Sequence, residues 1–180
     1  MCTSHRPRDI TRRKFTGLAI TAAGVGLLPW RAWAADTPLA NTLAIMCIDY
    51  RLVDPTVQYL DFLTSQSKKF DVVAMAGASL AGMRTQEFPK AFDGFWEQVQ
   101  TATKVHPLIQ KVIVIDHREC GAYKEVYGEL TGDEEEKKHL DVMMNVQKQF
   151  SMRYARLQSE FWLMSKAQNT WKPERLLPPR

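Results

Sequence analysis

Five side chains suited to metal binding or acid–base chemistry follow two apolar runs of the sequence. Cys47, Asp49 and Arg51 come after the first run, and His117 and Cys120 come after the second. Two thiolates and an imidazole are good donors for Zn²⁺, and they leave the fourth position to water or to Asp49. Three protein ligands with one open position are typical of catalytic zinc sites, where the metal lowers the pKa of bound water from about 15.7 to roughly 7. The pattern predicts one Zn²⁺ per chain.

The acid–base pair of the first motif has two possible arrangements beside such a metal. Asp49 either accepts a hydrogen bond from the zinc-bound hydroxide or takes the fourth position and closes the site. Arg51 is placed to hold the carboxylate by a bidentate pair and keep it off the metal. Cys120 precedes a predicted helix, and a helix N-terminus lowers the pKa of a thiol there, which favours metal binding.

Three near-continuous apolar runs predict strands that are buried on both faces, with helical patterns between and after them. The predicted strands are residues 42–48, 70–76 and 111–116, and the predicted helices begin near Asp54, Pro89, Gly121 and Asp133. This alternation predicts parallel βαβ units with right-handed crossovers. The fold class is therefore α/β, a small three-layer parallel sheet of about three to four strands with a long C-terminal helix. If the first and third strands are neighbours, both motifs meet at the carboxyl edge, where such sheets bind ligands.

The last predicted helix starts with an acidic run and continues to Met164, and residues 171–180 read as an extended tail. The run Asp133–Glu136 is typical of a solvated first turn that complements the helix dipole. From Leu140 onward, apolar residues alternate at spacings of three and four. This spacing indicates either a seam between subunits or packing against the chain's own sheet.

The two motifs together resemble those of the β-class carbonic anhydrases, in which Cys-x-Asp-x-Arg and His-x-x-Cys-Gly end two parallel strands. The resemblance covers residues 42–130. It implies that Cys47, His117 and Cys120 bind zinc and that Asp49 and Arg51 gate the metal. The implied reaction is the reversible hydration of carbon dioxide to bicarbonate, in a homodimer or higher homo-oligomer.

One stretch departs from that family and leaves the substrate open. Residues 76–79 read Ala-Gly-Ala-Ser, where the family has a stretch like Arg-Asn-Ala-Gly-Asn. Relatives on this scaffold hydrolyse carbonyl sulfide or carbon disulfide, so another small molecule of this kind is an alternative substrate. A non-catalytic zinc-binding protein on the same scaffold is a further alternative.

Two readings compete with the metal site. Cys47 and Cys120 form a disulfide in the first, because exported chains meet an oxidising compartment. In the second, Ser79 is the nucleophile of a serine hydrolase, since Gly77–Ala81 resembles a nucleophile elbow and Asp116 and His139 follow in order.

Several other residues have ordinary structural interpretations. His106 and His139 are interpreted as surface histidines. Tyr50 and Trp96 fit either a substrate pocket or core packing.

Residues 1–34 have the layout of an export signal. A basic cluster precedes the mild apolar run 15–28, and Ala32-Trp33-Ala34 is a small-x-small cleavage pattern. Residues 11–15, Thr-Arg-Arg-Lys-Phe, resemble a twin-arginine signal. We expect the protein in the periplasm or otherwise outside the cytoplasm. An uncleaved N-terminal anchor and a general secretory signal are the alternatives.

Cleavage of this signal changes the charge of the chain. The segment holds six of the 24 basic residues and one of the 20 acidic residues, so the charge falls from +4 to −1. The remaining domain, 35–180, has no basic stripe, and we expect no nucleic-acid partner. Its expected partners are a small-molecule substrate, copies of itself and, through the signal, the export machinery.

Overall fold

The computed structural model describes residues 40–63 and 70–177, so the predicted signal, 1–34, lies outside the described residues. A single sheet with strand order β2-β1-β3-β4-β5 organises this part of the chain. The strands are β1 (Thr42–Met46), β2 (Phe70–Ala74), β3 (Lys111–His117), β4 (Gln158–Ala167) and β5 (Thr170–Leu177). All neighbouring pairs are parallel except β4 and β5, which form an antiparallel hairpin. The predicted α/β class is confirmed.

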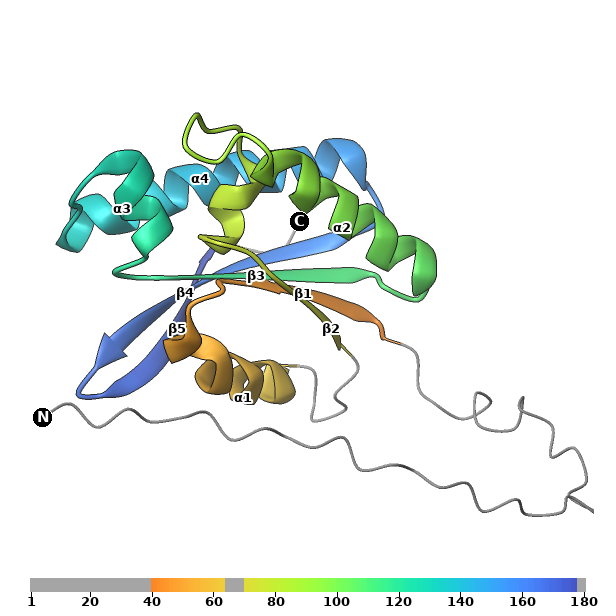
Figure 1. The fold of residues 1–180 in the computed structure, drawn as a ribbon. Helices are drawn as coiled ribbons and strands as arrows, with labels where there is room; N and C mark the ends of the chain where they lie inside the picture. The colour runs from red at the N-terminus through yellow and green to blue at the C-terminus, as the bar shows by residue number, and fades with distance from the viewer. Residues whose placement is uncertain (1–39, 64–69, 178–180) are drawn as a thin grey trace, which may run out of the picture. The chain divides into compact units, whose positions relative to one another are not determined.

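Helices cover both faces of the sheet and give three layers (Figure 1). Helix α1 lies on one face, and α2, α3 and α4 lie on the other. The α-helices are α1 (Val53–Leu63), α2 (Ala91–Val105), α3 (Gly121–Tyr127) and α4 (Gly132–Arg153), and two short 3₁₀ helices are η2 (Tyr50–Leu52) and η3 (Ala78–Gly82). Covering both faces requires apolar side chains on both, and every residue of β1 is buried.

The C-terminal part of the chain differs from the sequence prediction. Helix α4 ends at Arg153, and the segment predicted as the end of that helix and a tail forms β4 and β5. The apolar positions Leu157, Phe161 and Met164 fit helical spacing, but β3 offers residues 158–164 a parallel partner. Pairing with β3 therefore determines the structure of this segment, and the sheet has five strands.

A buried carboxylate helps to join these C-terminal strands to β3. Glu160 on β4 is 4% exposed, and its Oε1 lies 2.7 Å from Lys111 Nζ on β3. Arg175 on β5 approaches the other oxygen at 3.2 Å. A hydropathy pattern does not predict a buried strand at a segment that contains a charged residue. Such a side chain is buried only when its ion-pair partners are in place.

Helix α4 packs against its own chain. Its buried side includes Val142, Met143, Val146 and Phe150. The ring of Phe150 meets Trp96 on α2 at a centroid distance of 4.9 Å and Phe161 on β4 at 6.4 Å. Of the two readings of the apolar spacing, packing on the chain's own core is the one observed, and Trp96 belongs to this core. Within 40–63 and 70–177, no helix is long and apolar enough to cross a membrane.

Candidate metal centre

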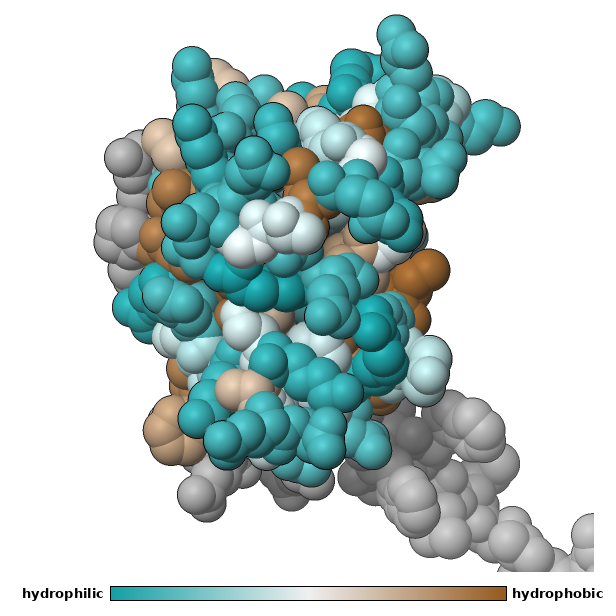
Figure 2. All heavy atoms as spheres, turned by 90° about the vertical axis from the view of Figure 1, so that its left-hand side faces the viewer, coloured by the Kyte–Doolittle hydropathy of each residue, from teal (hydrophilic) through white to brown (hydrophobic). Residues whose placement is uncertain are grey.

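Three side chains that could hold a metal ion meet at the carboxyl edge of the sheet. Cys47 follows the end of β1, His117 is the last residue of β3, and Cys120 caps the N-terminus of α3. Because β1 and β3 are neighbours, the candidate ligand atoms of the three residues all lie within 4.8 Å of one another. All three are buried. Figure 2 looks onto this side of the molecule, whose surface is mostly hydrophilic.

The two thiols are free and close to each other. Cys47 Sγ and Cys120 Sγ lie 3.9 Å apart, well beyond the roughly 2.05 Å of a disulfide bond. The backbone N–H of Gly77, after β2, donates to Cys47 Sγ at 3.4 Å. Such a contact favours the thiolate, which is the form that binds metals. The structure therefore does not contain the disulfide of the alternative reading.

The imidazole of His117 has one nitrogen engaged and one available. Its Nδ1 donates to the carbonyl of Arg118 at 2.8 Å, so the neutral ring carries its lone pair on Nε2. Nε2 is buried and has no hydrogen-bond partner within the described part of the chain. A buried nitrogen without a partner costs free energy, and a metal ion removes that cost. The donor set fits Zn²⁺, which prefers thiolate and imidazole ligands.

The electrostatics of the cluster favour one thiolate without any metal. The hydrogen bond from Cys120 lowers the pKa of Cys47 to about 4, against the opposing effect of burial, and His117 adds to this lowering. The same contact with Cys47 raises the pKa of Cys120, contrary to the lowering expected from its helix N-terminus. Burial disfavours the charged imidazole, but the Cys47 thiolate outweighs this effect and raises the pKa of His117.

Asp49 and Arg51 form the bidentate pair that the sequence predicts. Arg51 Nη2 donates to Asp49 Oδ2 at 2.7 Å, and Arg51 Nε donates to Oδ1 at 3.0 Å. Asp49 is the N-cap residue of η2, and its side chain also accepts from the backbone N–H of Arg51. The hydrogen bond from the guanidinium lowers the pKa of Asp49 to about 2. Asp49 Oδ2 lies 3.9 Å from His117 Nε2, so the carboxylate borders the ligand cluster while Arg51 holds it.

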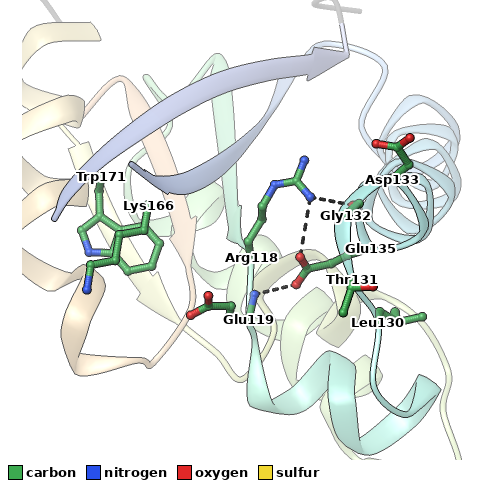
Figure 3. Close-up of a pocket in the computed structure, with 9 residues that line it drawn as sticks. All are labelled: Arg118, Glu119, Leu130, Thr131, Gly132, Asp133, Glu135, Lys166 and Trp171. Atoms are coloured by element: carbon green, nitrogen blue, oxygen red, sulfur yellow. Dashed lines mark hydrogen bonds and ion pairs between the residues drawn. The ribbon is translucent and has the colours of Figure 1, made fainter. Parts of the chain in front are cut away.

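A pocket of about 430 Å³ lies beside the turn that joins His117 to Cys120 (Figure 3). Arg118 and Glu119 of this turn line it, together with Glu135 of α4 and Trp171 of β5. The rings of Trp171 and His117 lie nearly perpendicular to each other, with an interplanar angle of 84° and a centroid distance of 6.1 Å. The acidic run is thus not simply solvated, because Glu135 is 7% exposed and Glu136 pairs with Arg118.

A second buried cluster adjoins the metal centre through the residue before His117. The carboxylate of Asp116 accepts from Ser79 N at 2.8 Å, Ser79 Oγ at 2.5 Å and Tyr123 Oη at 2.7 Å. His139 Nδ1 lies 3.0 Å from the same carboxylate. His139 is fully buried, so its interpretation as a surface histidine was wrong. The cluster ties β3 to η3, α3 and α4.

This cluster does not have the geometry of a serine hydrolase. The hydroxyl of Ser79 faces Asp116, and no hydrogen bond among the described residues joins it to His139. A nucleophilic serine needs the imidazole next to its hydroxyl, and the substrate must reach it. Ser79 has no exposed surface.

The remaining predicted residues lie away from the ligand cluster. His106 is the C-cap residue of α2, and its Nδ1 contacts Asp71 Oδ2 at 2.5 Å. Tyr50 is 85% exposed at the start of η2.

Three groups were not predicted from the sequence: the N–H of Gly77 and the carboxylate of Glu135 beside the candidate metal centre, and the hydroxyl of Tyr123 in the Asp116 cluster. One signal was available for Glu135. It shares a helix face with His139, Val142 and Val146, and all four are buried.

The chain belongs to the family described as "Putative carbonic anhydrase", whose model matches residues 39–163. The matched range contains all five predicted site residues, from Cys47 to Cys120. The resemblance seen in the two motifs is therefore confirmed at the level of the family.

Similar proteins include two from Rickettsia, both described as uncharacterized. The one from Rickettsia bellii is 30% identical over 128 residues, which are 69% of this chain and 76% of that protein. The one from Rickettsia conorii is 34% identical over 90 residues, or 50% of this chain, and the match spans only 47% of that relative's length.

Among solved structures, a carbonic anhydrase from Glaciozyma antarctica has a TM-score of 0.47 at 10% identity, covering 78% of this chain and 83% of its own. A tetrameric β-carbonic anhydrase from Sordaria macrospora has a TM-score of 0.43 at 14% identity, covering 80% and 84%.

Proposed function

We propose that this chain is a zinc-dependent enzyme that catalyses the reversible hydration of carbon dioxide to bicarbonate. Cys47, His117 and Cys120 would hold one Zn²⁺ per chain, and Asp49 and Arg51 would act beside it. One observation carries the proposal: two free thiols and an imidazole nitrogen that has no hydrogen bond within the described part of the chain converge within 4.8 Å at the carboxyl edge of the sheet. Membership of the family supports the choice of reaction.

When bound, zinc supplies a Lewis acid that brings the pKa of a coordinated water down to roughly 7. The protein residues supply orientation and charge. Asp49 is ionised at neutral pH because the guanidinium of Arg51 keeps its pKa near 2. An ionised carboxylate can only accept hydrogen bonds, so Asp49 is suited to orienting a water through that water's hydrogen.

Arg51 has the complementary task of restraining Asp49. Two nitrogens of Arg51 engage both carboxylate oxygens. Asp49 Oδ2 lies 3.9 Å from His117 Nε2. The hydrogen bonds from Arg51 oppose any movement of the carboxylate toward the proposed metal ligands. We propose that the pair keeps the fourth metal position free for water.

The test is the metal content of the purified protein together with its rate of carbon dioxide hydration. We expect about one zinc per chain and measurable hydration in the wild type, and loss of both in Cys47→Ser. Ser79→Ala is the matched control, because it removes a buried polar group near the site but no proposed ligand. Zinc retained in Cys47→Ser would contradict the ligand assignment.

The same measurement separates catalysis from zinc binding alone. The non-catalytic alternative is favoured by one observation. Residues 76–79 read Ala-Gly-Ala-Ser where the resemblance implies a more polar stretch, and among them Gly77 contributes a backbone N–H to Cys47. Protein with one zinc per chain and no hydration of carbon dioxide would support this alternative. Carbonyl sulfide and carbon disulfide should then be tested with the same preparation.

We also propose export by a twin-arginine signal in residues 1–34 and a periplasmic location. The support is the sequence of residues 11–15 before a mild apolar run. Replacing Arg12 and Arg13 by lysine should leave the protein in the cytoplasmic fraction. Unchanged export of this double variant would contradict the proposal.

We further propose that the chain forms a homodimer or a larger homo-oligomer, which the resemblance to the β-class enzymes supports. Light scattering on the purified protein should give a mass that is a multiple of the single chain. A monomer at micromolar concentration would contradict the proposal.

A further inference from the structure

The turn between His117 and Cys120 contains a residue in a disfavoured backbone conformation. Glu119 has φ +58°, which is in the left-handed region. A side chain with a Cβ adopts this region at a cost in free energy, and glycine does not pay it. Such a residue persists only when the surrounding structure holds it in place. Because Cys120 is the next residue, the conformation of Glu119 determines where the second thiol lies.

The backbone groups of Glu119 are held from two directions. Its N–H donates to Glu135 Oε1 on α4 at 2.5 Å, and its carbonyl accepts from Arg51 Nη2 at 3.4 Å. Arg51 is the residue that grips Asp49. The turn therefore connects the α4 carboxylate on one side with the Asp49–Arg51 pair on the other.

Arg118 compensates the buried charge of Glu135 and fixes the turn further. Arg118 Nη1 lies 3.6 Å from Glu135 Oε2 and donates to the Gly132 carbonyl at 2.9 Å. Its Nη2 pairs with Glu136, and its Nε donates to Ser165 Oγ at 3.1 Å. The interactions of Arg118 with Glu135 and Gly132, and that of Glu135 with Glu119, are drawn in Figure 3. Glu135 is thus fixed in position, and its free oxygen points at the N–H of the strained residue.

We infer that Glu135 is a positioning residue for the metal centre: its carboxylate holds Glu119 in the left-handed conformation and thereby places Cys120 beside His117 and Cys47. This inference rests on the metal site of the proposed function. It assigns Glu135 no contact with metal or substrate. Residues that orient metal ligands from outside typically contribute 10- to 100-fold in metal affinity, and we expect an effect of this size.

Two substitutions of Glu135 distinguish the effect of where its carboxylate oxygen lies from the effect of its negative charge. Glu135→Asp keeps the negative charge beside Arg118 but withdraws the oxygen from the N–H of Glu119, so zinc affinity should fall about 10- to 100-fold. Glu135→Gln keeps an oxygen at the same reach and loses the charge, so it should retain most of the affinity. Glu134→Ala is the matched control, because Glu134 is an exposed acid on the same turn of α4 and should bind zinc as the wild type does.

A change at the strained residue itself tests the connection. In Glu119→Gly the left-handed conformation has no Cβ penalty. The conformation of the turn should therefore depend less on the hydrogen bond from the N–H of residue 119 to Glu135 Oε1. Adding Glu135→Asp to Glu119→Gly should therefore cost much less affinity than adding it to the wild type. A purely structural role for Glu135 would instead lower stability equally in both backgrounds and leave zinc affinity unchanged.

The measurement is competition for zinc between the metal-stripped full-length protein and a chromophoric chelator. Thiolate-to-metal absorption bands of the Co²⁺ form report on ligand geometry independently of activity. The expected result is a weakened Glu135→Asp with altered Co²⁺ bands and a nearly normal Glu135→Gln. Equal zinc affinity in wild type and Glu135→Asp, or an equal loss in the Glu119→Gly background, would overturn the inference alone. A wild-type protein that binds no zinc would overturn the proposed function and this inference with it.

Discussion

Arg51 Nη2 lies 2.7 Å from Asp49 Oδ2, and that same oxygen lies 3.9 Å from Nε2 of His117. Asp49 Oδ2 is thus held by the guanidinium of Arg51, and it borders the ligand cluster, whose bound metal would attract it. The balance between these two attractions determines whether Asp49 assists a water or displaces it.

Replacement of Arg51 should allow Asp49 to take the fourth metal position and exclude water from it. In Arg51→Ala, Asp49 is free to approach the metal, and we expect the carbon dioxide hydration rate to fall about 100-fold while zinc stays near one per chain. Arg51→Lys should also lose most of the activity, because an ammonium cannot engage both oxygens. The measurement is hydration rate and zinc content on the same preparations.

A surface ion pair supplies the control for Arg51. Arg84 pairs with Asp93 at 3.3 Å, and both side chains are more than two-thirds exposed. Arg84→Ala should therefore leave hydration unchanged. Full activity in Arg51→Ala, or loss of its zinc, would show that Arg51 does not act by restraining Asp49.

The convergence of the three residues of the candidate metal centre was predictable from the sequence, because each of them lies at or next to the end of a strand or the start of a helix. Cys47, His117 and Cys120 end buried strands or begin a helix, and parallel strands bring such ends to one edge. The Asp49–Arg51 pair is local in sequence, so its geometry depended on only a few backbone angles. Glu135, by contrast, acts over sixteen residues, and its acidic neighbours gave it the appearance of a solvated first turn.

The same contrast between local and long-range interactions explains the errors in the predicted fold. Strands β1 and β3 were predicted correctly because each is a nearly continuous apolar run. Strand β2 was also predicted as a strand, but it lies at the edge of the sheet and none of its five residues is buried, so its prediction as a strand buried on both faces was wrong. Strand β4 has Ser159 and Glu160 among its buried residues, and its apolar side chains also fit helical spacing. Pairing with β3 and β5 makes it a strand, and the same neighbouring strands supply the ion-pair partners of Glu160, which are distant in sequence.

Asp116 should be important mainly for stability. It is 1% exposed and accepts hydrogen bonds from Ser79 and Tyr123, so Asp116→Ala leaves several buried donors unsatisfied. Each such donor costs about 1–3 kcal/mol, and we expect a total loss of roughly 3 kcal/mol or more in the free energy of unfolding. Urea denaturation of the purified protein measures this loss.

Ser79→Ala is the milder test of the same cluster. It removes one hydroxyl and should cost about 1–2 kcal/mol while leaving carbon dioxide hydration nearly unchanged. The serine hydrolase hypothesis predicts the opposite: Ser79→Ala would keep its normal stability and lose the enzymatic activity. Abolished activity in a stable Ser79→Ala variant would revive that alternative.

The thiol of Cys47 should titrate far from its ordinary value in metal-stripped protein. Its pKa is lowered from 9.0 to about 4, chiefly by the hydrogen bond from Cys120. Thiolate ultraviolet absorbance should therefore appear as the pH rises through about 4, with the second thiol ionising only at high pH. In Cys47→Ser the low-pH transition should be absent, and its persistence there would assign it to another group.

This lowered pKa also gives a direction for stability. Because the folded-state pKa lies below the unfolded one, the Cys47 thiolate contributes stability that is complete above pH 9 and is lost as the pH falls through about 4. Metal-stripped Cys47→Ser should show a smaller decrease in the free energy of unfolding over this range. An identical pH dependence in both proteins would contradict the assignment.

Removal of zinc should destabilise the fold, because its proposed ligands come from the ends of β1 and β3 and from the start of α3. Binding to the folded state alone contributes about 2.7 kcal/mol when free zinc is 100 times Kd. For a domain of this size, that corresponds to a fall in Tm of roughly 5–10 °C on stripping with a chelator, restored by adding zinc. Differential scanning calorimetry checks this, with Cys47→Ser as the control that should not respond. An equal response of Cys47→Ser to zinc would place the stabilising metal elsewhere on the chain.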